Sequence, residues 1–430
     1  MITSGYLINR MKSIAKRLFD DICILIIPIF QKRALYRLKG KKKLKCVFFV
    51  WYEEMWKCEG VYNRMTVDDG FDPFILVCPV KNRDKKDILD RMDRCYSYFK
   101  DKGYRVINAY ESNKDKYIDV DKELSPDIIF YSYPYEGVID ENFFVTRFLH
   151  KLTIYVSYAY VTSNYYRYFY DQIIHNLVWR YYVENESSMH YSILFSRCKG
   201  RNAVNTGYPG IEPFIKDKID VSLEGWKLKD RKLKRIIWAP HHSIEKEGEM
   251  LFSCFLMYCD FMLELAEKYN EKVQFVFRPH PELRNRLKNV WDEEKIENYY
   301  NKWKLLYNGS FHKGNYVDLF FSSDAIIHDC GSYIQEYLFM NKPAMRTING
   351  MPLEDNCNPF TIECIDMYYK AYDKADIEEF VRNVINDVDP MKEEREKFVN
   401  EFLKPKTLPS ELIVKDIIDS IESQKLYNRN

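Results

Sequence analysis

Residues 323–332 read Ser-Asp-Ala-Ile-Ile-His-Asp-Cys-Gly-Ser, and this stretch decides the fold class. Its apolar run at 325–328 has the length and composition of a buried strand. The Gly-Ser pair that follows opens a predicted helix over 332–339. A strand, a tight turn and a helix in direct succession are typical of one βα unit of a parallel sheet.

The same succession repeats on both sides of this stretch, because short apolar runs alternate with helical patterns from residue 45 onward. We therefore predict two doubly wound α/β halves that join near residue 215. The predicted strands are 46–51, 74–78, 105–109, 127–131, 235–239, 273–277, 304–307, 325–328 and 344–347, and the predicted helices are 84–100, 142–150, 250–269, 332–339 and three within 375–427. A tyrosine-dense stretch over 155–182 has no clear period and predicts neither element.

This pattern predicts four segments. They are a basic amphipathic arm over 1–44, a Rossmann-like domain over 45–215, a second Rossmann-like domain over 216–375, and C-terminal helices over 376–430. At about 100–200 residues per domain, 430 residues are enough for two or three domains with sizeable cores.

The composition is that of a folded chain without a strong overall charge. The 65 Lys and Arg residues nearly cancel the 64 Asp and Glu residues, so nothing indicates nucleic acid as a partner. The 11 Cys residues are an odd number, form no Cys-x-x-Cys pair, and in several cases stand inside apolar runs. We expect buried, reduced thiols and therefore a cytoplasmic protein.

The N-terminal arm is strongly basic, because residues 1–45 hold 12 Lys and Arg residues against two Asp residues. An apolar set recurs there at helical spacing: Met11, Ile14, Leu18, Ile22 and Leu25. Basic amphipathic helices of this kind bind anionic lipid, so we predict a peripheral location on the inner face of the cell membrane. A basic helix packed on its own protein is the alternative. The apolar run at 22–30 is too short to span a bilayer.

Three turns that follow predicted strands in the second half are rich in chemically active side chains. They read Trp-Ala-Pro-His-His-Ser at 238–243, Phe-Arg-Pro-His-Pro at 277–281, and the stretch at 323–332. Ligands of open α/β sheets bind outside the carboxyl ends of the strands, where these turns lie. Four of the eight histidines fall in them: His241, His242, His280 and His328. A single histidine at a strand end is commonly structural, but four at successive strand ends indicate a binding site.

The chemistry of these turns suits a diphosphate. Gly331 and Ser332 would present backbone N–H groups and a hydroxyl where a helix begins, a place that favours anions. Arg278 and His280 stand on a loop held by two prolines and would face the charge that grows as a phosphate bond breaks. Glu336, one turn into the helix, could accept hydrogen bonds from a ribose diol. Alternatively, Arg278 is an exposed loop cation and Glu336 is a solvated surface carboxylate.

At these residues the sequence resembles the CDP-glycerol glycerophosphotransferase family of teichoic-acid and capsule enzymes. The resemblance covers most of residues 235–345. It rests on Trp-Ala-Pro at 238–240, Arg-Pro-His-Pro at 278–281, and the stretch from 323 through Glu-Tyr-Leu at 336–338 to Asn-Lys-Pro at 341–343. It implies a GT-B-like fold of two Rossmann-like domains facing a cleft, with the acceptor on the N-terminal domain and CDP on the C-terminal domain.

The resemblance also implies roles for single residues. His280 takes the position of a phosphate-contacting histidine, Asp329 and Ser332 fall in the phosphate-binding turn, and Glu336 takes the ribose-contacting position. Together with the neighbouring turns, the predicted donor-phosphate site comprises His241, His242, Ser243, Arg278, His328, Asp329, Gly331 and Ser332. No cofactor and no metal are expected, because neither half has an Asp-x-Asp pair in a strand-end loop and the cations could neutralise the diphosphate.

The sequence departs from the family at the expected catalytic base. Cys330-Gly331 replaces a Tyr-Ser pair, and His328 replaces a threonine. Many members also carry a Trp-His-Gly-Thr segment whose histidine is a candidate base, whereas the comparable stretch at 155–160 reads Tyr-Val-Ser-Tyr-Ala-Tyr. Glu53 and Glu54 follow the first strand of the N-terminal half and are candidate catalytic bases beside the expected cleft. Alternatively, they cap or solvate the next helix.

The activity that the resemblance implies is transfer of a polyol phosphate, with glycerol phosphate as the first candidate, from a CDP-linked donor. The acceptor would be a hydroxyl of a lipid-linked or saccharide molecule in cell-surface polymer synthesis, and CMP would be released. A GT-B glycosyltransferase that uses a nucleotide-sugar is the second hypothesis. A non-catalytic capsule-assembly protein is the third, because the Trp-His-Gly-Thr segment is missing.

Overall fold

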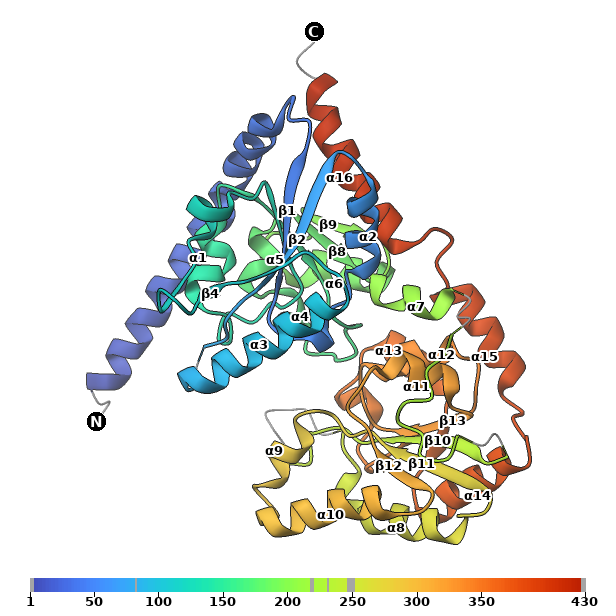
Figure 1. Cartoon of the computed structure of the whole chain (residues 1–430). Coiled ribbons are helices and arrows are strands. Elements are labelled where there is room, and N and C mark those ends of the chain that lie inside the picture. Colours follow the sequence, from blue (N-terminus) through green and yellow to red (C-terminus); the bar gives the residue numbers. More distant parts are fainter. Residues whose placement is uncertain (1–3, 82, 217–219, 230–231, 246–251, 427–430) are drawn as a thin grey trace. The chain divides into compact units, whose positions relative to one another are not determined.

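The computed structural model describes residues 4–81, 83–216, 220–229, 232–245 and 252–426 (Figure 1). The chain divides into two compact units. Unit 1 comprises residues 1–160, 165–212 and 405–430, and unit 2 comprises residues 161–164 and 213–404. Each unit is built on a parallel sheet accompanied by helices, so the predicted pair of doubly wound α/β halves is confirmed.

The sheet of unit 1 has seven strands in the order β3-β2-β1-β6-β7-β8-β9, and all neighbours run parallel. The strands are β1 Leu44–Val50, β2 Phe71–Val77, β3 Val106–Asn108, β6 Ile128–Tyr131, β7 Leu152–Val156, β8 Arg180–Val183 and β9 Ala203–Asn205, beside a small antiparallel pair, β4 Tyr110–Glu111 and β5 Lys116–Tyr117. The strand order reverses between β1 and β6. In an open parallel sheet such a switch point is where a ligand crevice forms at the carboxyl ends of the strands.

The helices of unit 1 connect these strands and pack against them. They are α1 Ser4–Leu38, α2 Glu59–Val67, α3 Lys85–Asp101, α4 Tyr166–Tyr170, α5 Ile173–Leu177, α6 Glu186–Phe195 and α16 Pro409–Leu426, with short turns η1 Glu53–Met55, η2 Val120–Leu124, η3 Glu141–Phe143, η4 Val145–Phe148 and η5 Pro209–Ile211. Helix α7, Glu212–Ile215, follows at the boundary with unit 2.

Helix α1 has two apolar faces, of which one is buried and the other is exposed. One face, with Cys23, Ile24 and Ile27, is buried where α1 contacts α5, β7 and α16. The other face carries the apolar set noted in the sequence, and its members are between 52% and 78% exposed: Met11, Ile14, Leu18, Ile22 and Leu25. The helix therefore packs on its own protein and at the same time presents a second apolar stripe outward.

The sheet of unit 2 has six parallel strands in the order β12-β11-β10-β13-β14-β15. The strands are β10 Lys234–Ala239, β11 Val273–Phe277, β12 Gly309–Phe311, β13 Ala325–His328, β14 Ala344–Thr347 and β15 Tyr369–Ala371. The order reverses between β10 and β13, which are neighbours in the sheet. These are the strands that precede the first and third histidine-bearing turns.

Successive residues of the unit 2 strands enter two different cores, as strand geometry requires. Ile236 and Trp238 of β10 pack with helices α8 Phe255–Lys268, α10 Glu293–Leu305 and α14 Lys374–Ile385. Ile237 and Ala239 pack with helices α11 Tyr316–Ser322, α12 Tyr333–Leu338 and α13 Pro359–Asp366. Because both faces are covered, the strands are almost continuously apolar. The remaining elements are α9 Leu283–Leu287, α15 Lys392–Phe398, η6 Leu353–Asp355 and η7 Val399–Leu403.

Two predicted elements were wrong. The strand expected at 304–307 is the end of α10 and the turn after it, because Ile296, Tyr299, Tyr300 and Trp303 bury one helical face and the next strand starts only at Gly309. The helix expected at 142–150 is two short 3₁₀ turns, since Phe143, Phe144 and Val145 are all buried and three consecutive residues cannot share one face of an α-helix.

The other predicted elements agree in type with the structure. The tyrosine-dense stretch holds the end of β7, α4, α5 and the start of β8, and β15 is a short edge strand without a prediction. The helix expected over 250–269 begins at Phe255, and residues 250 and 251 lie outside the described residues. The C-terminal helical segment predicted over 376–430 is divided, because residues up to 404 belong to unit 2 and α16 belongs to unit 1.

All eleven cysteines are free and buried, as the sequence predicts. Within the residues that the structure describes, no helix combines the length and apolar character needed to cross a bilayer.

Candidate functional site

The switch point of unit 2 is held together by one carboxylate. Asp329, just after β13, accepts hydrogen bonds from the backbone N–H of His241, after β10, and from the backbone N–H of Cys254 at 2.6 Å, before α8. The hydroxyl of Thr347, at the end of β14, donates to the same carboxylate at 3.3 Å. Burial raises the pKa of Asp329 to about 6, although these hydrogen bonds lower it. Asp329 therefore ties the end of β13 to the ends of β10 and β14 and to the start of α8.

Three of the predicted histidines form one cluster beside this carboxylate. The ring centroids of His242 and His280 lie 4.2 Å apart, those of His241 and His242 4.1 Å apart, and those of His241 and His280 5.1 Å apart. The backbone N–H of His280 donates to the carbonyl of Pro240 at 2.9 Å, which ties the second turn to the first. The structure thus brings together side chains that are about 40 residues apart in the sequence.

All three rings are held neutral. Burial, followed by the charges of His242 and Arg278, lowers the pKa of His280 to about 3, and burial lowers the pKa of His242 to about 4. The pKa of His241 is also well below its usual value, first because of burial. The site therefore holds neutral imidazoles at neutral pH.

Backbone hydrogen bonds assign the ring protons. The N–H of Glu282 donates to Nδ1 of His280, and the N–H of Ser243 donates to Nδ1 of His241, each at 3.2 Å. A neutral ring whose Nδ1 accepts carries its proton on Nε2. His280 and His241 therefore offer Nε2–H donors, which suit an anion. The hydroxyl of Ser243 is already engaged, because it lies 2.8 Å from Nδ1 of His241 and accepts from the N–H of Phe252 at 2.9 Å.

The cluster of His241, His242 and His280 also resembles a metal-binding set, since one nitrogen from each lies within 4.8 Å of the others. A metal ligand must be an unprotonated nitrogen. The assigned tautomers put protons on Nε2 of two of the three rings, so the cluster fits an anion better than a metal ion. The expectation of a metal-independent site stays a prediction.

Arg278 is half-buried and fixed, so the exposed-loop interpretation does not hold. Its Nε donates to the hydroxyl of Tyr333 at 3.1 Å, and its Nη1 lies 3.2 Å from Nδ1 of His312. The guanidinium also lies 5.6 Å from the ring centroid of Tyr316. Burial, then the charge of Arg278, lowers the pKa of His312 to about 4. His312, after β12, is a further histidine at this edge that the sequence reading passed over.

The turn at Gly331 and Ser332 is as compact as predicted, but the helix after it is short. Helix α12 has only six residues, so its dipole adds little to anion binding, and the side chain of Ser332 makes no capping hydrogen bond. A Cβ atom at Gly331 would lie 3.0 Å from the hydroxyl of Thr162, which explains the need for glycine. The start of α12 is therefore a weaker anion site than the sequence predicts.

Glu336 is 2% exposed, which excludes a solvated surface role. Its charge raises the pKa of Tyr316, after the larger effect of burial. His328, the last residue of β13, is turned away from the cluster into the core. Its ring packs on Tyr368 at 5.3 Å, and neither ring nitrogen has a hydrogen-bond partner among the described residues.

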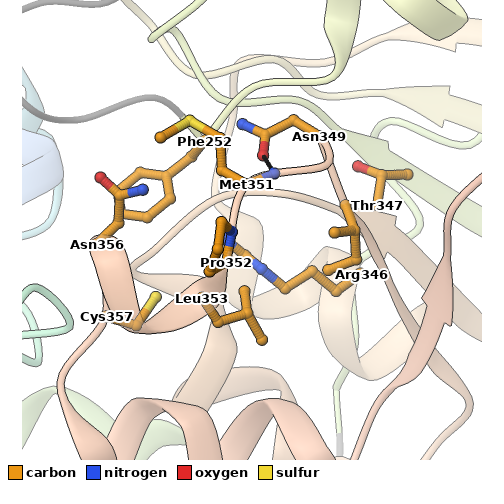
Figure 2. A pocket seen from close by; sticks show the side chains of 10 residues that line it. Phe252, Arg346, Thr347, Asn349, Met351, Pro352, Leu353, Asn356 and Cys357 are labelled. Carbon is orange, nitrogen blue, oxygen red and sulfur yellow. Dashed lines mark hydrogen bonds between the residues drawn. The ribbon is translucent and has the colours of Figure 1, made fainter.

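A pocket opens beside the cluster at the carboxyl end of β14 (Figure 2). Its volume is about 270 Å³ including the open mouth. The lining residues are Phe252, Arg346, Thr347, Ile348, Asn349, Met351, Pro352, Leu353, Asn356 and Cys357. The sequence reading missed Arg346, although a cation inside the apolar run of a doubly covered strand was a signal that could have found it.

In unit 1, Glu53 and Glu54 form η1 directly after β1, at the switch point between β1 and β6. Glu53 is half-buried and Glu54 is exposed. A third carboxyl, Glu184, follows β8 and was not singled out from the sequence. It is 4% exposed, and the hydroxyls of Ser188 and Ser157 lie near enough to its carboxyl to lower its pKa. Burial raises the pKa of Glu184, and Ser157, in the stretch that lacks the family's histidine, lies beside it.

Comparison with known proteins supports the fold. No protein-family model matches the chain, and no curated protein matches it in sequence. Among solved structures, a histidine-to-alanine variant of the wall teichoic acid polymerase TagF superposes with a TM-score of 0.56 at 14% identity, covering 96% of this chain and 98% of that one. A UDP-N-acetylglucosamine 2-epimerase gives 0.56 at 12% identity, covering 91% and 98%, respectively.

A second such epimerase, from Neisseria meningitidis and bound to UDP-GlcNAc, gives a TM-score of 0.51 at 14% identity, covering 88% of this chain and all of that one. At these identities the likeness establishes the fold alone. Together with the two parallel sheets and their strand order, it shows that this chain has the GT-B-like, two-domain α/β architecture expected from the sequence.

Proposed function

We propose that the protein transfers a polyol phosphate, with glycerol phosphate as the first candidate, from a CDP-linked donor to a hydroxyl of a lipid-linked or saccharide acceptor. The observation that carries this proposal is the set of neutral, N–H-donating imidazoles beside Arg278 at the switch point of unit 2. The likeness to a teichoic acid polymerase over nearly the whole of both chains supports a role in cell-surface polymer synthesis, as for a capsule polysaccharide or a teichoic acid.

In this reaction the acceptor oxygen attacks the distal phosphorus of the donor. A new P–O bond forms to the acceptor, the P–O bond to the CMP phosphate breaks, and CMP leaves with the bridging oxygen. Nε2–H of His280 and the guanidinium of Arg278 would hydrogen-bond the charge that develops on that oxygen. Because His280 starts out neutral, it acts in the first instance as a hydrogen-bond donor and not as a pre-formed acid.

The acceptor hydroxyl must lose its proton to a base. Glu53 and Glu54 remain candidates, and Glu184 joins them because its buried carboxyl, which follows β8 in the same sheet, has a raised pKa. A carboxyl with a raised pKa is a stronger base once ionised. Three variants, Glu53→Gln, Glu54→Gln and Glu184→Gln, separate these candidates, because only loss of the true base lowers kcat at unchanged donor affinity.

A nucleotide-sugar transferase is the second candidate, favoured by the likeness to enzymes named for UDP-N-acetylglucosamine. The decisive test follows the leaving group. Incubation with CDP-glycerol, other CDP-polyols and UDP-sugars should release CMP from a CDP-polyol together with a phosphodiester product. Release of a nucleoside diphosphate from a sugar donor would establish the second candidate. Absence of nucleotide binding in a thermal-shift screen would leave the non-catalytic assembly role.

We also propose that the outward stripe of α1 binds an anionic membrane surface. The stripe is apolar, lies on a helix rich in Lys and Arg, and is exposed in the structure. Such binding would place the protein peripherally on the inner face of the cell membrane, close to a lipid-linked acceptor.

A further inference from the structure

Arg346 is a buried cation that lowers the pKa of Asp329 but forms no ion pair with it. It is 2% exposed, its Nε and Nη1 are buried without a hydrogen-bond partner, and no carboxylate of the described residues forms an ion pair with it. Its guanidinium lies 5.6 Å from the ring centroid of Phe252, across the pocket described above. In Figure 2 the side chain runs from the end of β14 into the pocket.

The other fully buried arginines of unit 2, in contrast, have polar partners. Arg395 is 0% exposed and forms an ion pair with Asp389, and its Nε donates to Asn341 at 3.2 Å. Arg235 donates from Nη2 to the carbonyl of Lys229 at 3.1 Å. A buried guanidinium whose N–H groups lack acceptors is costly for the folded state, so its retention indicates that a ligand supplies the missing hydrogen bonds.

The same pocket contains a buried hydrogen-bond acceptor, Oδ1 of Asn356, that has no donor among the described residues. Asn356 is 4% exposed, and its backbone is fixed, because its N–H donates to the carbonyl of Leu353 at 3.1 Å and its carbonyl accepts from Asn164 at 3.2 Å. Its side-chain oxygen Oδ1 is nevertheless buried with no hydrogen-bond partner among the described residues. An anion alone would be repelled by this oxygen, whereas a hydroxyl group would satisfy it.

We propose that this pocket is a subsite for a small hydroxylated anion, with Arg346 binding the phosphate or carboxylate group and Oδ1 of Asn356 accepting from a hydroxyl. The apolar side chains of Phe252, Met351 and Leu353 face its carbon skeleton. The subsite deepens the proposed function, on which it rests for the identity of the substrate, because it adjoins Asp329 and His241 through Thr347. A polyol phosphate or a sugar acid has the required chemistry.

The proposed subsite predicts the order in which small ligands bind, from tightest to weakest. Melting temperature and calorimetric titration of the full chain would be measured with glycerol 3-phosphate, glycerate, inorganic phosphate and glycerol. Glycerol 3-phosphate or glycerate should bind more tightly than inorganic phosphate, and glycerol should not bind measurably. The better of the two organic anions identifies the anionic group. If inorganic phosphate binds as tightly as both of them, the hydroxyl contact is wrong.

Two variants test the two halves of the pocket separately. Arg346→Met should weaken binding of the organic anion by at least about tenfold, the loss typical of a charged hydrogen bond. Asn356→Leu should remove the preference over inorganic phosphate and leave phosphate binding unchanged. If His280→Ala abolishes binding and Arg346→Met does not, the anion sits among the histidines and the proposal fails.

Stability of the ligand-free protein gives an independent readout. Arg346→Met removes a buried cation that has no ion pair among the described residues, so its melting temperature should equal or exceed that of the wild type. Arg395→Met is the matched control, because it leaves Asp389 without its ion pair and should melt at a lower temperature. If both variants are destabilised to the same extent, Arg346 has a structural role and the subsite is excluded.

Turnover separates this proposal from the proposed function. If CDP-glycerol is consumed but Arg346→Met keeps the wild-type kcat and KM, the subsite is wrong while the function stands. If no CDP-polyol is consumed but glycerol 3-phosphate or glycerate still binds through Arg346, the subsite stands and the function must be revised.

Discussion

The rings of His242 and His280 lie 4.2 Å apart, so that protonation of either places a cation directly beside the other. This relationship contributes to the low pKa of His280, after the larger effect of burial. Six of the eight histidines have a pKa below the usual value, in every case mainly because of burial: His175, His241, His242, His280, His312 and His328.

The first prediction is acid sensitivity of the folded state. These histidines take up a proton in the unfolded chain near pH 6.5 but stay neutral in the folded chain down to about pH 4 or below. The unfolded state then binds more protons, so the free energy of unfolding falls as pH drops below 6.5, by at most about 1.4 kcal/mol per pH unit for each buried histidine. Asp329, whose pKa is raised to about 6, takes up one proton in the folded state first and so offsets part of this loss of stability.

The variant His175→Phe tests the effect away from the candidate site. His175 stacks on Tyr181 at 5.0 Å, and both of its ring nitrogens are buried without a hydrogen-bond partner within the described residues. Phenylalanine keeps the stacking and removes one protonation site. Urea denaturation should show a gain over the wild type that grows as pH falls from 6.5 to 4.5. A gain that is independent of pH would contradict the assigned neutral state.

The second prediction separates the two ends of the donor site. His280→Ala should lower kcat for CMP release by about 10²- to 10³-fold, because it removes a hydrogen bond to the leaving group. Glu336→Ala should mainly raise KM for the donor, since a ribose contact is equally strong in the ground and transition states. Steady-state kinetics with CDP-glycerol, alongside circular dichroism to confirm folding, measures both. Near-normal turnover of His280→Ala would remove the leaving-group role.

The third prediction concerns Asp329 as a positioning residue. Asp329→Asn offers one carbonyl oxygen to two backbone N–H groups, so one of them loses its acceptor. We expect a loss of about 1–3 kcal/mol in the free energy of unfolding. Thr347→Val, which removes only the 3.3 Å hydroxyl contact, is the matched control and should cost less. If chemical denaturation gives the same loss in the free energy of unfolding for both variants, the two amide hydrogen bonds contribute no more than the hydroxyl contact.

The fourth prediction is independence from metal ions. Nε2–H groups on two of the three clustered histidines oppose metal binding, so turnover should survive treatment with EDTA. Micromolar Zn²⁺ should not raise the melting temperature. If chelation abolishes turnover and Zn²⁺ or Mg²⁺ restores it, the tautomers assigned to His241 and His280 are wrong.

The fifth prediction concerns membrane binding by α1. Leu18→Glu and Ile22→Glu place charge on the outward stripe without touching the buried face, so the fold should be unaffected. Both should reduce sedimentation with anionic vesicles, and wild-type binding should weaken as salt rises. Val67→Glu, at a still more exposed apolar position on α2, is the control. Deleting residues 1–30 is a poorer test, because Cys23, Ile24 and Ile27 belong to the core.

The sequence predicted the sheet strands well because their signal is local. Apolar runs such as 235–239 and 273–277 match β10 and β11 to within a residue, and the turn that follows each one carries the expected histidines. The strand expected at 304–307 failed for the same reason, since a short apolar run at a helix end has the same composition as a strand.

The sequence does not show which titratable side chains are buried, and the positions of their protons depend on that burial. The neutral state of His280 follows from its surroundings, and its tautomer follows from one backbone N–H. Arg346 stands out in the sequence as a cation within an apolar strand, but only the structure shows that its Nε and Nη1 are buried without a hydrogen-bond partner among the described residues. Glu184 likewise has a raised pKa because the folded chain buries it.

Unit 1 includes a segment, residues 405–430, that follows unit 2 in the chain. Ser410, at the start of α16, donates from its N–H and its hydroxyl to the carboxylate of Glu212, and Asp416 accepts from Arg180 and Tyr182 of β8 at 2.8 Å. About 190 residues of unit 2 are synthesised between these partners. At about 5–20 residues per second, the nascent N-terminal sheet waits roughly 10–40 s for its last helix. Unit 2 can thus fold first, and truncation of the final 25 or so residues would damage the half of the molecule made earliest.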